Sequence, residues 1–167
     1  MSRNKEIAIQ GALLIITIIL MALLSSEQFL STYNLSIMLH QIPEFGIIAL
    51  AVMVVMLLGD INLSVIAMTK LAGIIGGLFM VSMQLHDSFL AIFGIIIMII
   101  IGLTCGLLNG ALVSFIGVPA IIATLAMMLL FEGVALYVTH GGAVSNFPRE
   151  FLWIGNDSIA FIPVPLI

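Results

Sequence analysis

Two residues of opposite charge lie inside long apolar stretches of the chain. Lys70 falls well within the stretch 61–83, and Glu132 falls well within the stretch 120–139. Charged side chains at such positions are rare in membrane helices, usually face the interior of a bundle, and often mark a transport path. We therefore expect Lys70 and Glu132 to form an intramembrane ion pair, and a place on a transport path, where the two relay protons, is the alternative.

A second set of polar residues lies where one apolar stretch gives way to the next. Asp60, Asn62 and Ser64 follow the stretch 43–58, which is short for a membrane span. The break then falls within the thickness of the membrane, where irregular backbone is tolerated if it lines a cavity. Asn109 lies inside a later apolar stretch, and we expect it to face the same pathway.

Glycine spacing indicates where helices approach one another closely. Gly102, Gly106 and Gly110 recur every four residues, as do Gly73 and Gly77. Such small residues let helix backbones come together in lipid, where no hydrophobic force drives association. We expect these five glycines to pack against neighbouring helices.

Patterns that would indicate an enzyme or a metal site are missing from the chain. The sequence contains no Gly-x4-Gly-Lys-Ser/Thr loop for binding nucleotide phosphates. His40, His86 and His140 are scattered, and Cys105 is a single cysteine in an apolar run. We therefore expect no catalytic residues, no metal and no cofactor in this chain.

The elements that carry these residues follow from composition. The chain has 167 residues, of which 63% are hydrophobic and 7% charged, with a mean hydropathy of +1.37. A soluble domain carries about 25% charged residues, so a soluble fold is excluded. Four Lys and Arg against eight Asp and Glu also exclude a nucleic-acid-binding protein. The chain is an integral membrane protein.

Five apolar stretches are long enough to span a membrane as helices. We expect an all-α polytopic protein, one transmembrane domain over residues 1–167, with a sixth span beginning near residue 161. Arg3 and Lys5 place the N-terminus in the cytoplasm by the positive-inside rule. The predicted spans are 7–24, 43–58, 61–83, 89–113 and 120–139.

Four stretches in chain order carry a resemblance to a known family. They are QFLSTYNL at 28–35, DINLSV at 60–65, GLLNG at 106–110, and VPAIIATL at 118–125, the last continuing through Glu-Gly to Thr-His-Gly at 139–141. Together they resemble the permease subunits of binding-protein-dependent ABC importers of the ribose, xylose, galactose and autoinducer-2 type. The resemblance covers nearly the whole chain, and it adds Thr124 to the candidate pathway residues.

This resemblance implies a function and a set of partners. It implies a permease subunit that imports a ribose-type monosaccharide, or a related small polyol or signal molecule, across the bacterial cytoplasmic (inner) membrane. The implied partners are a second permease subunit in a homodimer or heterodimer, cytoplasmic subunits that bind the ATP, and an extracytoplasmic sugar-binding protein. The chain resembles the N-terminal half of such permeases, so we expect it to be truncated and inactive alone.

Several residues depart from the family pattern and leave two alternatives open. Asp60 and Asn62 stand where the family has glycine and aspartate, Glu132 replaces an arginine, and Lys70 replaces a small apolar residue. One alternative is an ion-coupled secondary carrier that uses Lys70 and Glu132. The other is a membrane fragment that transports nothing.

Overall fold

The fold is built almost entirely from helices that are long and apolar. The computed structural model describes residues 3–82, 88–159 and 162–164. Five helices in these ranges are long and apolar enough to cross a membrane, as the sequence predicts. The elements are α1 (Arg3–Leu24), α2 (Ser26–Phe29), α3 (Thr32–Leu57), α4 (Val65–Ser82), α5 (Ser88–Ser114), α6 (Ala120–Thr139), α7 (Arg149–Asn156), β1 (Ser158–Ile159) and β2 (Ile162–Pro163).

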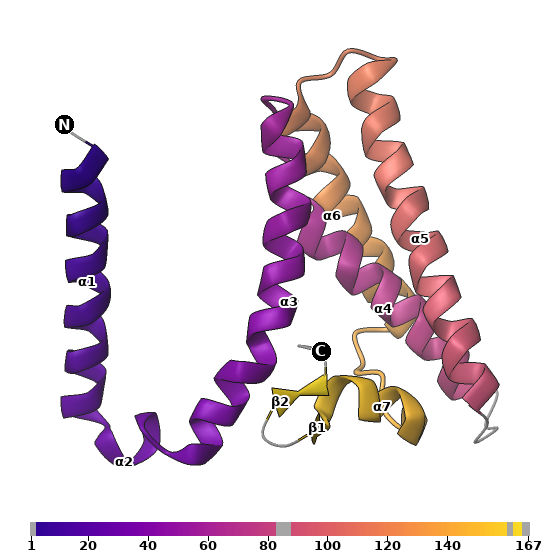
Figure 1. Ribbon diagram of the computed structural model, residues 1–167. Helices are drawn as coiled ribbons and strands as arrows, with labels where there is room; N and C mark the ends of the chain where they lie inside the picture. Colours follow the sequence, from indigo (N-terminus) through magenta and orange to yellow (C-terminus); the bar gives the residue numbers. More distant parts are fainter. Residues whose placement is uncertain (1–2, 83–87, 160–161, 165–167) are drawn as a thin grey trace.

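The second spanning helix, α3, begins earlier than the expected start at residue 43. Ser31 caps it, because the Ser31 hydroxyl accepts a hydrogen bond from the Asn34 amide at 3.1 Å. Pro43 lies inside the helix instead of starting it. A proline within a helix removes one backbone hydrogen bond and bends the helix, and α3 changes direction along its first half (Figure 1).

The third spanning helix, α4, begins later than the expected residue 61. Helix α3 ends at Leu57, and Gly59 takes a positive φ of 86° that glycine adopts without strain. Residues 60–64 are not helical, and α4 starts at Val65. We call residues 58–64 the junction segment. The expected end of this span at Met83 lies outside the described residues.

Helix α4 forms the centre of a three-helix core. It runs obliquely and packs mainly against α5 and α6 (Figure 1). Alanines on α4 and α6 allow the helices to approach, and larger side chains from the same two helices fill the space beside Cys105 of α5. The buried cluster at this interface consists of Ala67, Leu71, Cys105, Met127, Phe131 and Ala135.

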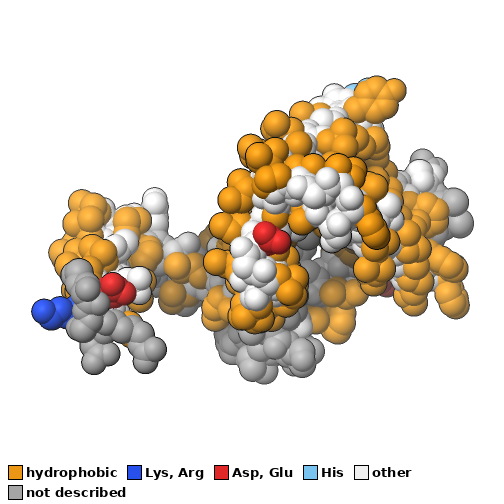
Figure 2. All heavy atoms as spheres, turned by 90° about the horizontal axis from the view of Figure 1, so that it is seen from above, with side chains coloured by type: hydrophobic (Ala, Val, Ile, Leu, Met, Phe, Trp, Pro, Cys, Tyr) orange, Lys and Arg blue, Asp and Glu red, His pale blue; other side chains and the backbone are white. Residues whose placement is uncertain are grey.

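The outer faces of the helices are apolar and exposed. Helix α1 lies apart from the bundle (Figure 1), and none of its most apolar window is buried by the rest of the chain. Hydrophobic side chains cover most of the visible surface, with few charged groups among them (Figure 2). Soluble monomers rarely expose such large apolar areas, so lipid or other membrane helices must cover these faces. The protein is a multi-pass membrane protein.

The chain after α6 forms a small cap at one end of the bundle. Helix α7 precedes an antiparallel hairpin in which Ser158 pairs with Pro163 and Ile159 with Ile162. The expected sixth span near residue 161 falls largely outside the described residues, and the described pair Ile162–Pro163 belongs to β2.

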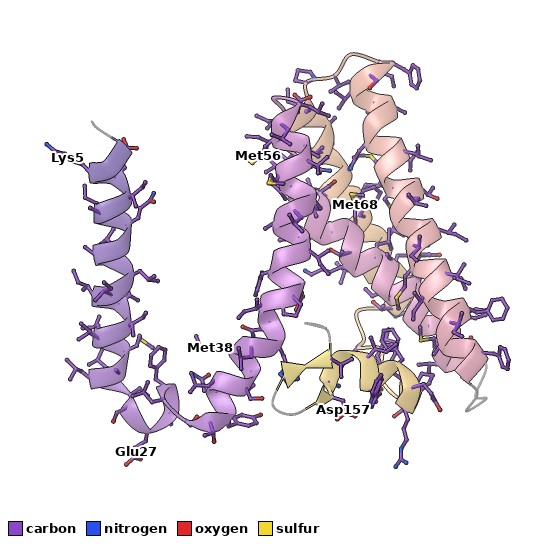
Figure 3. All side chains as sticks on the ribbon, viewed as in Figure 1. Lys5, Glu27, Met38, Met56, Met68 and Asp157 are labelled. Carbon is purple, nitrogen blue, oxygen red and sulfur yellow. The ribbon has the colours of Figure 1, made fainter. Side chains whose placement is uncertain are left out.

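The two ends of the bundle hold different connections between the helices. The connections from α3 to α4 and from α5 to α6 lie at one end, and α7 with the hairpin lies at the other (Figure 1). Lys5 lies at the opposite end from Glu27 and Asp157 (Figure 3). This arrangement has the alternating connections that five membrane crossings require.

Candidate functional site

A buried hydrogen-bond network joins the junction segment to α5. Ser64 is fully buried, and its hydroxyl donates to Asn62 Oδ1 at 2.8 Å. Asn109 on α5 donates from Nδ2 to the Ser64 hydroxyl at 2.6 Å, over 45 residues of sequence. Ser64 therefore satisfies polar groups of two separate elements, as buried polar groups require.

The same network starts helix α4. The Ser64 amide also donates to Asn62 Oδ1, at 2.9 Å, which is the local side-chain-to-backbone bond that asparagine forms in turns. Met68, one turn into α4, lies within the bundle (Figure 3) and its sulfur accepts from Asn109 Nδ2 at 3.3 Å. These hydrogen bonds therefore fix the backbone conformation immediately before Val65, where α4 begins.

Thr124 joins the junction segment to α6. Its hydroxyl oxygen accepts a hydrogen bond from the Leu63 amide at 3.1 Å and donates to the Ala120 carbonyl at 2.7 Å. Thr124 is 3% exposed, so water does not replace these bonds. The junction segment is thus held by α5 on one side and by the first turn of α6 on the other.

Four of the five predicted pathway residues come together in this network. Asn62, Ser64, Asn109 and Thr124 are buried or half-buried and bonded within the junction. Asp60 is exposed and stands outside the network. The buried side chains are placed to hold the junction segment in position, whereas the Asp60 side chain is exposed.

Lys70 and Glu132 line one cavity. The cavity has a volume of about 360 Å³ and lies between α4, α6 and the start of the loop after α6. Lys70 is exposed and Glu132 is half-buried. The two opposite charges predicted to meet therefore face a shared space. Its lining residues are Lys70, Ile74, Glu132, Ala135, Leu136, Thr139, Gly141 and Gly142.

A second cavity adjoins the first and has aromatic walls. Its volume is about 430 Å³, and it shares Lys70, Ile74 and Gly142 with the first cavity. Phe147 and Phe151 form part of its lining, and their rings stack with centroids 5.5 Å apart. Together the two cavities are lined by the charged Lys70 and Glu132 and by the aromatic Phe147 and Phe151.

The predicted packing glycines behave differently from one another. A Cβ atom at Gly77 would meet the ring of Phe147 at 2.7 Å, so the loop after α6 packs directly on this glycine. Gly106 faces Met68 at 3.7 Å. The remaining three, Gly73, Gly102 and Gly110, have no described atom within 4 Å of the Cβ position. Their packing against a helix outside this chain stays a prediction.

A close contact between α4 and α5 involves two glycines, Gly76 and Gly94, that the spacing rule did not select. A Cβ at Gly76 would meet the Met98 side chain and lie 2.8 Å from the Gly94 carbonyl oxygen, and a Cβ at Gly94 would meet Met80. The adjacent pair Gly76-Gly77 was a signal available in the sequence. Which neighbour each glycine faces depends on the crossing of α4 and α5, which spacing alone does not determine.

The described residues hold no group of three or more His, Cys, Asp or Glu side chains that could bind a metal ion. The chemistry available is therefore that of hydrogen bonds, one ammonium group and one carboxylate facing a cavity, and aromatic surface.

Comparisons with known proteins agree over nearly the whole chain. Residues 34–151 match the family model described as branched-chain amino acid transport system / permease component. The chain is similar to the autoinducer 2 import system permease protein LsrD of Salmonella typhimurium, at 33% identity over 97% of this chain and 48% of the relative.

Two further relatives show the same relation in length. The autoinducer 2 import system permease protein LsrC of Photorhabdus laumondii is 28% identical over 98% of this chain and 49% of the relative. The L-arabinose ABC transporter permease protein AraH of Azospirillum brasilense is 28% identical over 94% of this chain and 45% of the relative. The chain spans about half the length of the curated relatives it matches. No solved structure matches it.

Proposed function

Because the chain belongs to the family of branched-chain amino acid transport system permease components, we propose that it acts as a transmembrane permease subunit of an ABC importer. The observation that carries this proposal is the continuous family match over 34–151, which includes α4, α5, α6 and most of α3. The importer resides in the bacterial cytoplasmic membrane with the N-terminus in the cytoplasm, an orientation supported by Arg3 and Lys5.

The proposed substrate is a monosaccharide or a related small polyol or signal molecule. The relatives that support it are named for L-arabinose and for autoinducer 2. The chain itself provides a passage and no reaction, so we propose that it is not an enzyme.

Other subunits supply energy and substrate in this proposal. The sequence has no phosphate-binding loop of the Gly-x4-Gly-Lys-Ser/Thr type, so separate cytoplasmic subunits bind and hydrolyse ATP. A second permease subunit completes the pore, and an extracytoplasmic binding protein delivers the sugar. The broad apolar faces of α1 and α3 support further helix contacts within the membrane.

Within the permease, we assign the junction segment to the translocation pathway. Non-helical backbone at membrane depth is tolerated where protein buries it or where it borders a water-filled space. Asp60 and the half-buried Asn62 are the residues that face the pathway. Ser64, Asn109 and Thr124 act on it indirectly, because their hydrogen bonds fix the course of the segment.

An uptake assay tests this function. Membrane vesicles that contain the protein from its complete gene, the ATPase subunits and the binding protein are supplied with ATP and radiolabelled L-arabinose or autoinducer 2. ATP-dependent accumulation that disappears with a catalytically inactive ATPase supports the proposal. Uptake that survives this inactivation but collapses with an uncoupler indicates an ion-coupled carrier, and no accumulation of either compound contradicts the proposed substrates.

A further inference from the structure

Resting on the proposed import function, we infer that the two adjoining cavities beside α4 and α6 form one binding site for a small, neutral, polyhydroxylated molecule. The Lys70 ammonium and the Glu132 carboxylate are its polar contacts, and Phe147 with Phe151 provides its apolar wall.

The charge of the lining favours a neutral ligand. Lys70 and Glu132 are the charged residues that line the first cavity, and their formal charges cancel. An anion paired with Lys70 would lie beside the Glu132 carboxylate, and a cation paired with Glu132 would lie beside the Lys70 ammonium, so a net charge of either sign is disfavoured. A hydroxyl group both donates and accepts hydrogen bonds, so a polyol can accept from the ammonium and donate to the carboxylate at the same time.

The aromatic residues favour a ligand that also has apolar surface. Phe147 and Phe151 stack with an interplanar angle of 28° and line the second cavity together with Gly73 and Met98. An aromatic ring offers a flat apolar face, and the C–H face of a sugar ring packs against such a surface while its hydroxyl groups remain free. Charged hydrogen-bonding groups and aromatic rings lining adjoining cavities therefore match a carbohydrate, and L-leucine in the test below separates it from a zwitterionic amino acid.

The contacts of the surrounding elements hold the aromatic wall in place. The Phe147 ring fits directly over Gly77 of α4, so a larger side chain at Gly77 would displace it. Pro148, which is buried, precedes α7 and fixes the chain direction after Phe147. The wall is thus built from the loop after α6 and from α7, at the end of the bundle where Glu27 and Asp157 also lie (Figure 3).

The size and place of the site suit an entering solute. The first cavity has about 360 Å³, at the lower end of the range for small-molecule sites. Thr139, the last residue of α6, lines the cavity, and so does Glu132, about 10 Å from it along the helix at 1.5 Å per residue. In the proposed orientation this end of α6 faces outward, so an entering solute meets the cavity before the junction segment.

Cysteine protection tests the site directly. In a Cys105→Ala background, Leu136→Cys places a thiol in the cavity lining, and the reporter is its reaction rate with a charged, membrane-impermeant thiol reagent in vesicles. Val134→Cys is the matched control, because Val134 lies two residues away on another face of α6 and does not line either cavity. Ile74→Cys, which lines both cavities from α4, is a second reporter if Leu136→Cys reduces membrane insertion.

The expected result is that Leu136→Cys reacts, that Val134→Cys does not, and that L-arabinose slows the reaction several-fold whereas L-leucine and phosphate do not. Loss of the protection in Lys70→Met and in Glu132→Gln supports the two polar contacts. Protection by L-leucine alone overturns the polyol assignment, and a reaction that no probe slows overturns the site.

The proposed function is judged separately. ATP-dependent uptake by the Cys105→Ala protein without L-arabinose protection means that the function stands and the site fails. Protection without uptake means that the site stands and the import function fails.

Discussion

At the scale of single residues, buried polar side chains join separate elements of the chain through hydrogen bonds. Ser64 and Thr124 are almost completely buried, and each bonds to an element distant in sequence. In an apolar environment the loss of one partner leaves the other without a hydrogen bond, and that unpaired group costs more than the bond itself contributes. These residues are therefore sensitive to substitutions that barely change their volume.

Thr124→Val tests the bond between α6 and the junction segment. The substitution removes the acceptor for the Leu63 amide, and we expect a loss of about 1–3 kcal/mol in stability. Thr104→Val is the control, because Thr104 also donates to the carbonyl four residues earlier but is exposed. Thermal unfolding of the purified protein in detergent is the measurement, and equal losses in the two variants would contradict the role of Thr124.

Lys70 and Glu132 provide a second prediction. Since both face one cavity, Lys70→Met and Glu132→Gln should each lower stability, and the double variant should recover much of the loss. Two charges that interact across this cavity should show a coupling of about 0.5–3 kcal/mol. The control cycle pairs Glu132→Gln with Lys5→Met on α1, where we expect strict additivity. Additivity in the Lys70 cycle would mean that the two charges do not interact.

The sequence predicts which residues are unusual better than it predicts what they contact. The sequence alone singles out Asn62, Ser64 and Asn109, because they are polar residues within or between apolar stretches. The hydrogen bonds among them depend on the register between α4 and α5. That register is determined by all the side chains at the interface between the two helices. The exposure of Asp60 likewise follows from where the junction segment turns, at Gly59.

At the scale of elements, length and hydropathy are enough to predict the five membrane helices, and local exceptions decide their ends. Pro43 predicts a helix start by its residue type, yet α3 continues through it because the helix tolerates one missing hydrogen bond. Residues 61–64 are apolar enough to continue a helix, but the side chains of Asn62 and Thr124 bind the backbone there instead. A hydropathy pattern does not reveal where side chains replace the hydrogen bonds of a helix in this way.

The crossing of α4 and α5 yields a prediction at this scale. Gly76→Ala should lower stability by about 1–3 kcal/mol, because the added Cβ lies 2.8 Å from the Gly94 carbonyl oxygen and the backbones must separate. Gly73→Ala, three residues earlier on the same helix, meets no described atom within 4 Å and should cause no loss. Denaturation of both variants in the same detergent compares them. A larger loss at Gly73 would show that the predicted glycine stripe, and not Gly76, forms the close helix contact.

At the scale of the whole molecule, the order of the helices decides which connections share an end of the bundle. Lys5 and the two connections that carry the junction segment and Pro119 share one end, and α2 shares the other with α7. The positive-inside rule then predicts that the first end is cytoplasmic, since Arg3 and Lys5 belong to it and the single Arg149 begins α7 at the other end.

Side-specific labelling tests this orientation. In a Cys105→Ala background, Glu27→Cys and Asp157→Cys should react with an impermeant maleimide in right-side-out vesicles, because both positions are exposed and lie at the outer end. Lys5→Cys should react only after the vesicles are opened. The same pattern with the two groups exchanged would reverse the orientation and would place the polyol site on the cytoplasmic side.

Pro43 gives α3 a flexible hinge within its first half. The missing amide hydrogen leaves the Leu39 carbonyl without its donor within the helix, so we expect α3 to bend more easily at that turn. The part of α3 after Pro43 is anchored through α4 to the bundle, whereas the part before it continues into α2 and the detached α1. We therefore expect a sideways displacement of α1 to bend α3 at Pro43 before it changes the geometry of the junction segment.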